Sequence, residues 1–266
     1  MPESSECRLT AEFLNEYLQN TCITDWRFIG GKYTDSHPEG FEEFVNELPL
    51  LVEGVYCKGK FIYFILFNDN GYFYIMHSLR ITGCWQKKFD YYSSCRIDSY
   101  DKEPLWFRDS RGLATFRFTR DKDTLDGYIN GLGPDILNPE EFTLPAWKEI
   151  INKHRKKNIT SLMMCQNIVS GIGNYQKAES LYYAKISPLR KAATLNDEDI
   201  ERLYQGIILV SRSSYNHGGM SMYDYADENG SRGSYDSELK IYGRKNVSRT
   251  KTADGRITYW DSEVQK

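Results

Sequence analysis

The stretch Ser170-Gly171-Ile172-Gly173-Asn174 decides how the second half of this chain folds. Its two glycines let the backbone turn tightly, and the three-four spacing of apolar residues that follows predicts a helix over 174-184. The exposed N–H groups at the start of such a helix can bind a phosphate. A tight turn between two helices, with Asn174 as the cap, would explain the same residues without any ligand.

Outward from this turn, apolar residues recur at helical spacing from residue 140 onward, after a break at Gly131-Leu-Gly-Pro134. The helices predicted from this spacing cover 140-157, 159-168, 174-184 and 196-214. A surface loop rich in Gly, Ser and Asp is predicted over 217-235. We then expect a hairpin of strands 239-244 and 256-260, because Asp254-Gly255 favours the positive φ of a hairpin turn.

The half before the break has a different sequence pattern. Residues 4-19 predict a helix capped by Ser4 or Ser5, and the region 24-120, rich in Tyr, Phe, Ile and Thr, predicts many short strands. Those strands are predicted near 52-56, 60-67, 71-77, 80-86, 93-99 and 114-119. Such a pattern is typical of a β-sandwich or barrel.

We therefore expect an α+β protein of two domains. The first, residues 1-130, holds the N-terminal helix and the β-sandwich, and 131-139 form a linker. The second domain, residues 140-266, is helical and ends in the hairpin, which we place within 239-262.

Composition excludes several classes of protein. The chain has 266 residues and 40% hydrophobic content, enough for a sizeable core, but its apolar runs are far shorter than the roughly 20 residues of a membrane span. The six cysteines form no C-x-x-C pair, so we expect free thiols and no metal site. The net charge is -3, yet residues 147-266 carry 19 Lys and Arg against 14 Asp and Glu, an excess that suits a nucleic acid.

The chain begins Met1-Pro2-Glu3, which suggests a chemistry of its own. Loss of Met1 would expose Pro2 as a secondary amine, a nucleophile that can form an iminium ion with a sugar carbon. The positive end of a helix starting at residue 4 or 5 should lower the pKa of that amine, and Glu3 could act as general acid. An ordinary chain start, with a glutamate that favours a helix N-terminus, would explain the same residues.

Two basic residues are candidates for binding phosphates. Arg256 follows the predicted hairpin turn, and Lys60 opens an apolar strand after Gly59. A solvated arginine in a strand and a lysine at a sheet edge are the structural alternatives.

Together these motifs resemble the formamidopyrimidine-DNA glycosylase and endonuclease VIII family, and the resemblance covers nearly the whole chain in the same order. The family begins Pro-Glu, has a Gly-Lys strand start and a segment that Leu132-Gly-Pro-Asp135 matches. Gly171-Ile-Gly-Asn-Tyr175 with Glu179 matches its helix-two-turns-helix element. Ile241-Tyr-Gly-Arg244 and Gly255-Arg256 match its terminal hairpin, here without zinc-binding cysteines, as in zincless-finger members that resemble endonuclease VIII-like proteins.

The resemblance implies a bifunctional DNA glycosylase and AP lyase of base excision repair. Its partner would be damaged duplex DNA, with no cofactor, no metal and no membrane, and we expect an intracellular monomer, nuclear or cytoplasmic. The amine of Pro2 would attack C1′ of the flipped nucleotide with Glu3 and Lys60 as further catalytic residues, and β,δ-elimination would cut the strand. Lys60, Asn174 and Arg256 would hold phosphates.

Several positions depart from the family pattern. The usual Pro-Glu-Gly-Pro-Glu reads Pro-Glu-Ser-Ser-Glu here, so Ser4 and Ser5 add bulk that we expect near the lesion, while Glu6 is kept as a contact to the lesion or its ribose. The side chains that fill the gap left by the flipped base correspond to Ile81, Arg111 and Leu113, and only the arginine keeps its type.

These departures leave alternatives open. The 217-235 loop resembles the base-capping loop of formamidopyrimidine-DNA glycosylases, whereas the zincless finger resembles endonuclease VIII-like proteins, so oxidised purines and oxidised pyrimidines both stay candidate substrates. A catalytically weakened member that only binds lesions or abasic sites is the alternative function. A DNA-binding module outside the family is a third hypothesis, which gives Pro2, Glu3 and Lys60 no reason to occur together. Removal of Met1 distinguishes catalysis from binding alone.

Overall fold

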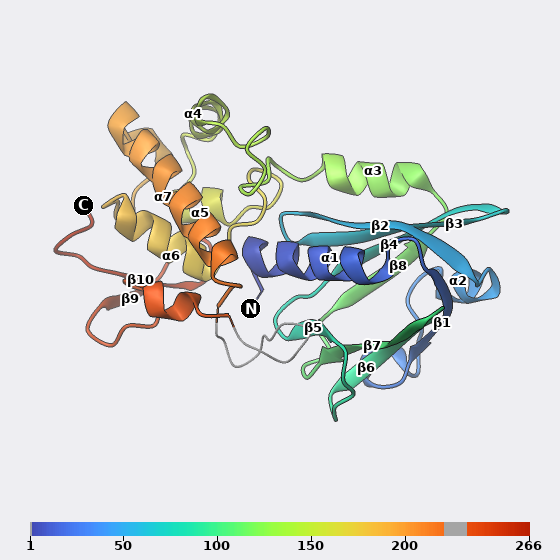
Figure 1. Cartoon of the computed structure of the whole chain (residues 1–266). Helices are drawn as coiled ribbons and strands as arrows, with labels where there is room; N and C mark the ends of the chain where they lie inside the picture. The colour runs from blue at the N-terminus through green and yellow to red at the C-terminus, as the bar shows by residue number, and fades with distance from the viewer. Residues whose placement is uncertain (1, 221–232) are drawn as a thin grey trace.

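The computed structural model describes residues 2–220 and 233–266, and the predicted α+β class is confirmed. Figure 1 shows the strands of residues 22–119 gathered on one side of the molecule, and the helices of residues 144–216 with the two strands of residues 248–260 on the other, with the N-terminus between them. The two largest hydrophobic clusters of the described residues underlie this division, one among the strands and the N-terminal helix and one among the later helices.

The first half of the chain consists of the N-terminal helix, eight strands and two further helices. Their bounds are α1 Ser4–Leu18, β1 Cys22–Phe28, α2 Phe41–Asn46, β2 Leu50–Lys58, β3 Phe61–Asn68, β4 Gly71–Ser78, β5 Gly83–Gln86, β6 Ser93–Ser99, β7 Lys102–Asp109, β8 Thr115–Thr119 and α3 Lys122–Asn130. The strands pair antiparallel in the order β5-β7-β6-β1-β2-β3-β4-β8.

This sheet folds over on itself into a sandwich. Trp85 of β5 donates its indole Nε1–H to Nε2 of His77 on β4 at 3.3 Å, so strands from opposite parts of the sheet order face each other. Trp26 of β1 is buried between the layers, edge-on to Phe64, Trp85 and other rings. Burial lowers the pKa of His77 to about 3, which keeps this core imidazole neutral at physiological pH.

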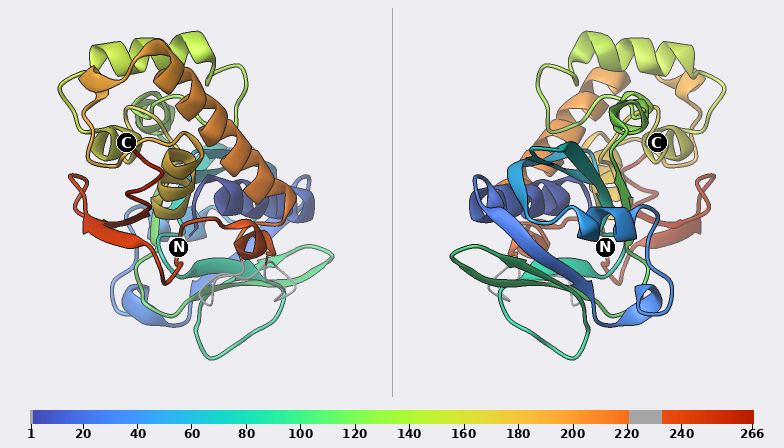
Figure 2. Two further views of the ribbon diagram at one scale, coloured as in Figure 1. Left: turned by 90° about the vertical axis from the view of Figure 1, so that its left-hand side faces the viewer. Right: turned by 90° about the vertical axis from the view of Figure 1, so that its right-hand side faces the viewer.

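The second half is helical. Its elements are α4 Leu144–Lys153, α5 Ile159–Met163, α6 Asn174–Tyr183, α7 Asp197–Asn216, the 3-10 turn η3 Tyr235–Glu238, and strands β9 Ser248–Lys251 and β10 Ile257–Trp260. Two more 3-10 turns, η1 Gly31–Tyr33 and η2 Ala192–Thr194, complete the described elements. α7 contacts both α6 and α1 and so joins the two halves. Figure 2 shows the red β9–β10 hairpin on the same side of the molecule as the N-terminus.

Several predicted elements were wrong or incomplete. The sequence pattern missed β1, β7, α2 and α3, and it made the helices 140-157 and 159-168 too long. α4 begins only at Leu144 because the side chain of Thr143 caps it and a proline occupies its first turn. The predicted strand 80-86 begins only at Gly83, because residues 80–82 form a turn.

The largest error concerns the hairpin. Residues 239-244 are not a strand, because the backbone N–H groups of Lys240, Ile241 and Tyr242 all donate to the carboxylate of Glu179, at 2.9, 2.9 and 2.7 Å. Three successive donors that converge on one carboxylate require a curved backbone. The first strand of the hairpin is therefore β9, at 248–251.

Candidate active site

The start of α1 is anchored to the start of α6. Glu3 is the N-cap of α1, in place of the predicted Ser4 or Ser5, and its carboxylate accepts the backbone N–H groups of Tyr175 at 3.0 Å and Gln176 at 3.1 Å. These are first-turn donors of α6, which have no partner within their own helix. They are engaged with Glu3, so a phosphate at Asn174 would have to use other donors.

Glu3 is almost completely buried, and burial raises the pKa of its carboxyl above the ordinary value. The positive charge of Lys60 opposes this rise, and the negative charge of Glu6 adds to it. The two hydrogen bonds from α6 favour the ionised form, yet desolvation outweighs them. A carboxyl with a raised pKa is suited to donate a proton.

Glu6 closes the capping box of α1. Its carboxylate accepts the backbone N–H of Glu3 at 2.7 Å and the hydroxyl of Tyr175 at 3.1 Å. It also accepts the backbone N–H of Met220 at 2.9 Å, just before the undescribed residues 221–232. The predicted base-capping loop over 217-235 falls mostly on those residues and thus outside the described structure. Glu6 connects the start of α1 to the point where that loop begins.

A cavity of about 210 Å³ lies beside Pro2. Lys60, in the turn between β2 and β3, and Arg256, in the turn before β10, both line it. The ammonium of Lys60 donates to the carbonyl oxygen of Ile172 at 2.8 Å. Burial lowers the pKa of Lys60, while the charge of Glu3 acts in the opposite direction. The cavity thus brings together three of the predicted site residues.

Other cavity residues were not predicted. Arg80 and Gln166 line the cavity, as do Cys7, Phe61, Ser78, Tyr128, Leu132 and Met164. Gln166 donates to the same Ile172 carbonyl at 3.0 Å and accepts the N–H of Gly171 at 3.0 Å, so it holds the glycine turn in place. Arg80 has a positive φ of 58°, which nothing in its sequence neighbourhood signals.

Asn174 lies outside this cavity. Its amide Nδ2 donates to the carbonyl oxygen of Ile257 at 3.1 Å and so ties the start of α6 to β10. This contact places Asn174 next to the strand that follows Arg256.

The three predicted gap-filling residues occupy neighbouring turns at one end of the sandwich. Ile81 lies between β4 and β5, and Arg111 and Leu113 lie between β7 and β8. Thr82 and Asp109 connect the two turns by a hydrogen bond of 2.5 Å. Arg111 and Leu113 are exposed, Ile81 is half-buried, and none of the three lines the cavity.

The expectation that Ser4 and Ser5 add bulk near the lesion finds no support in the packing. Both are fully buried, and the Ser4 hydroxyl accepts the amide of Gln176 at 2.9 Å. The Ser5 hydroxyl donates to the carbonyl oxygen of Ser211 at 3.0 Å. Both side chains therefore face α6 and α7, and neither lines the cavity beside Pro2.

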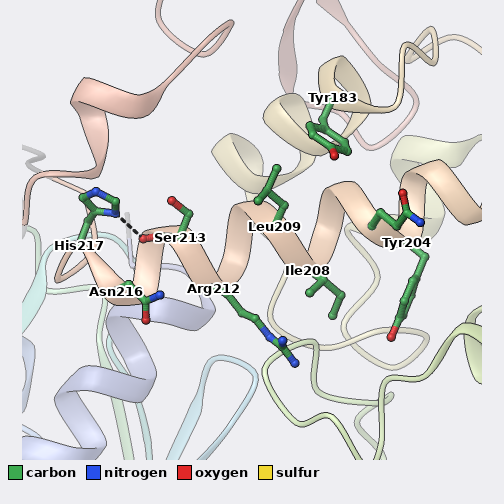
Figure 3. A pocket seen from close by; sticks show the side chains of 9 residues that line it. Tyr183, Tyr204, Ile208, Leu209, Arg212, Ser213, Asn216 and His217 are labelled. Carbon is green, nitrogen blue, oxygen red and sulfur yellow. Dashed lines mark hydrogen bonds between the residues drawn. The ribbon is translucent and has the colours of Figure 1, made fainter.

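A second hollow, of about 530 Å³, lies along α7. Figure 3 shows its side chains, among them Leu209 and Tyr183, with His217 Nδ1 hydrogen-bonded to the carbonyl oxygen of Ser213. It shares no residue with the cavity beside Pro2. Within residues 2–220 and 233–266, no group of three His, Cys, Asp or Glu side chains is arranged to hold a metal ion. No helix in that part of the chain is long and apolar enough to cross a membrane.

Known proteins are similar to this chain in sequence and in fold. The H2TH domain of formamidopyrimidine-DNA glycosylase matches residues 132–225. The formamidopyrimidine-DNA glycosylase of Prochlorococcus marinus MED4 is 32% identical over 219 residues, which cover 76% of this chain and 73% of that one. Its counterpart from strain MIT 9301 is 28% identical over an alignment of 296 positions, which spans 100% of this chain and 100% of that one.

Solved structures agree in fold. The MutM (Fpg) protein of Thermus thermophilus superposes with a TM-score of 0.85 at 22% identity, over 99% of this chain and 98% of that one. A Lactococcus lactis Fpg mutant in complex with DNA containing Fapy-dG gives 0.85 at 23% identity over both full chains.

A buried Pro-Glu start packed on a helix-two-turns-helix element, beside a basic cavity, defines a DNA glycosylase with AP lyase activity that binds DNA in base excision repair. The chain belongs to the formamidopyrimidine-DNA glycosylase and endonuclease VIII family. The sequence resemblance to this family is therefore confirmed.

Proposed function

We propose that Pro2, exposed after loss of Met1, is the nucleophile of this glycosylase. Its amine attacks C1′ of a damaged nucleotide, the base departs, and the nitrogen and C1′ are joined as an iminium ion. β- and δ-elimination then remove the sugar and cut the strand on both sides. The observation that carries this proposal is the position of Pro2 in the wall of a cavity that Lys60 and Arg256 also line.

Glu3 is the proposed general acid. As the sugar ring opens, its protonated carboxyl delivers a proton to the ring oxygen, which the raised pKa of this buried group favours. Glu6 supports the same segment through its hydrogen bond to the backbone N–H of Glu3, and we propose that it contacts the lesion or its ribose. The positive charge of Lys60 favours the ionised form of Glu3, and the negative charges of Glu3 and Glu6 favour the ammonium form of Lys60.

Phosphates are the proposed ligands of Lys60, Asn174 and Arg256. The cavity position of Lys60 and Arg256 and the hydrogen bond from Asn174 to Ile257, next to Arg256, support this assignment. Contacts of this kind position the backbone without reading sequence, and they make binding salt-dependent.

We propose damaged duplex DNA as the substrate, bound by a monomer. Ile81, Arg111 and Leu113 would enter the duplex where the damaged base has been flipped out, which their shared end of the sandwich supports. Residues 1-130 and 140-266 would act as two domains around the DNA, with 131-139 as linker; the separate cores support this division.

Single-turnover excision on duplexes with one oxidised purine or one oxidised pyrimidine tests the proposal. Pro2→Gly should strongly reduce excision of whichever base the wild type removes, while duplex binding stays near the wild-type level. Excision at the wild-type rate by both Pro2→Gly and Glu3→Gln would remove the mechanism, and excision of neither base by the wild type would favour a lesion-binding protein.

A further inference from the structure

One ion pair in the helical half is completely buried. The ammonium of Lys177, on α6, lies 2.8 Å from a carboxylate oxygen of Asp254, in the turn between β9 and β10. The side chains are 0% and 3% exposed. Removing two charges from water is costly and offsets their mutual attraction, so a pair buried this deeply adds little net stability.

Asp254 organises the turn that carries Arg256. Its second carboxylate oxygen accepts the hydroxyl of Thr252, whose backbone N–H donates to the carbonyl oxygen of Arg256 at 2.9 Å. The backbone N–H of Gly255 donates to the carbonyl oxygen of Thr252 at 2.9 Å. The backbone of Arg256 is thereby held at a fixed place relative to Asp254.

The other end of the pair is fixed relative to the proposed nucleophile. Lys177 directly follows Gln176, whose backbone N–H donates to the Glu3 carboxylate at 3.1 Å. One turn of α6 therefore holds both the start of α1 and the hairpin turn. Burial alone would raise the pKa of Asp254, but the hydrogen bonds from Lys177 and Thr252 hold it below its ordinary value. Burial lowers the pKa of Lys177, and its hydrogen bond to Asp254 acts in the opposite direction.

We propose that Lys177 and Asp254 are positioning residues that hold Arg256 at the DNA phosphate beside the cavity. This inference rests on the proposed function, because it takes Arg256 to be a phosphate ligand. The pair touches no substrate itself and acts on DNA affinity only through Arg256.

A double-mutant cycle tests the inference. The dissociation constant is measured on a duplex with a tetrahydrofuran abasic analogue for wild type, K177M/D254L, Arg256→Ala and the triple variant. We expect K177M/D254L to weaken binding about tenfold, the scale of one charge-assisted hydrogen bond, and to reduce the salt slope by about one. In the Arg256→Ala background the same double substitution should have no further effect.

Three results would overturn the inference. They are wild-type affinity in K177M/D254L, an equal loss in both backgrounds, and no effect of Arg256→Ala itself. Arg190→Met, which removes a 2.8 Å ion pair with Asp199 outside the hairpin, serves as the matched control and should leave the salt slope unchanged. If K177M/D254L fails to fold, Asp254→Asn, which keeps the shape of the turn, replaces it in the same cycle.

Failure of the proposed catalysis can be told apart from failure of this inference. The cycle reads binding to an analogue that cannot be excised, so it gives a result even for a protein that forms no Schiff base. The cycle could give the expected coupling between the ion pair and Arg256 while the wild type never forms a covalent adduct. That combination would contradict the catalytic mechanism and leave this inference standing.

Discussion

Glu3 and Tyr175 lie 172 positions apart in the chain, and a 3.0 Å hydrogen bond from the Tyr175 backbone N–H to the Glu3 carboxylate joins them. Through this contact, the first turn of α6 fixes the carboxyl that stands next to the proposed nucleophile. The absence of a side chain at Gly173 makes room for this contact, since a Cβ there would lie 2.1 Å from the Glu3 carboxyl carbon.

Replacing Glu3 by glutamine should remove the proposed general acid while leaving a side chain of the same size. We expect single-turnover excision to fall about 100- to 10,000-fold, the usual contribution of such a group, with duplex binding retained. Glu16→Gln, the same change at an exposed position of α1, is the control and should excise normally.

The pH profile gives this prediction a second measurement. An acid works only when protonated, so excision should decline as pH rises through the raised pKa of Glu3. The Pro2 amine works only when neutral, so excision should also decline as pH falls. We expect Glu3→Gln to lose the alkaline limb of this bell; an unchanged alkaline limb would mean that another group supplies the proton.

Substituting Gly173 by alanine should displace Glu3. The φ of Gly173 is -123°, which any residue can adopt, so the obstacle is one of space: the Glu3 carboxyl carbon would lie 2.1 Å from the new methyl group. We predict a loss of excision comparable to that of Glu3→Gln, measured beside circular dichroism spectra that show retained helix. Gly127→Ala in α3 meets nothing within 4 Å and should excise like wild type, with a stability gain of roughly 0.5–1 kcal/mol.

His77 should make the protein less stable in acid. Its pKa of about 3 in the folded state lies below the ordinary value of 6.5, so the unfolded chain binds the proton more readily. The contribution of His77 to stability is therefore complete above pH 6.5 and is lost as pH falls toward 3. Between pH 7 and 4.5 the loss should be about 2.5 kcal/mol.

Urea unfolding of wild type and His77→Gln at both pH values measures this term. The glutamine does not titrate, so the free energy of unfolding of the variant should depend less on pH by that amount. Equal pH dependence in the two proteins would contradict a neutral buried His77.

The sequence indicated which segments form the candidate site. A Pro-Glu start, a Gly-x-Gly turn and a Gly-Arg pair are local patterns, and local chemistry and backbone conformation explain them. What joins them could not be predicted. The bond between Glu3 and α6 and the pair of Lys177 with Asp254 are contacts between segments that are remote in sequence. No periodicity reports which backbone N–H groups a distant carboxylate will accept.

The incorrect prediction of a strand at 239-244 also results from a contact between segments that are remote in sequence. Its alternating side chains have a strand-like pattern, but Glu179 of α6 supplies an acceptor that bends the backbone at Ile241. The misplaced cap of α1 is instructive in another way. Serine is a favoured N-cap residue, yet Glu3 occupies this position. It has a reciprocal hydrogen-bond partner in Glu6 and accepts two backbone N–H groups of α6, while Ser4 and Ser5 are buried.

Borohydride trapping on a duplex with one abasic site tests the central claim most directly. Reduction makes an iminium between the protein and the sugar permanent, and intact-mass analysis establishes beforehand whether Met1 is present. We predict a covalent adduct for the protein that begins at Pro2 and none for a variant that retains Met1. An adduct formed equally by both proteins, or none by the processed protein under conditions where it binds the duplex, would contradict Pro2 as the nucleophile.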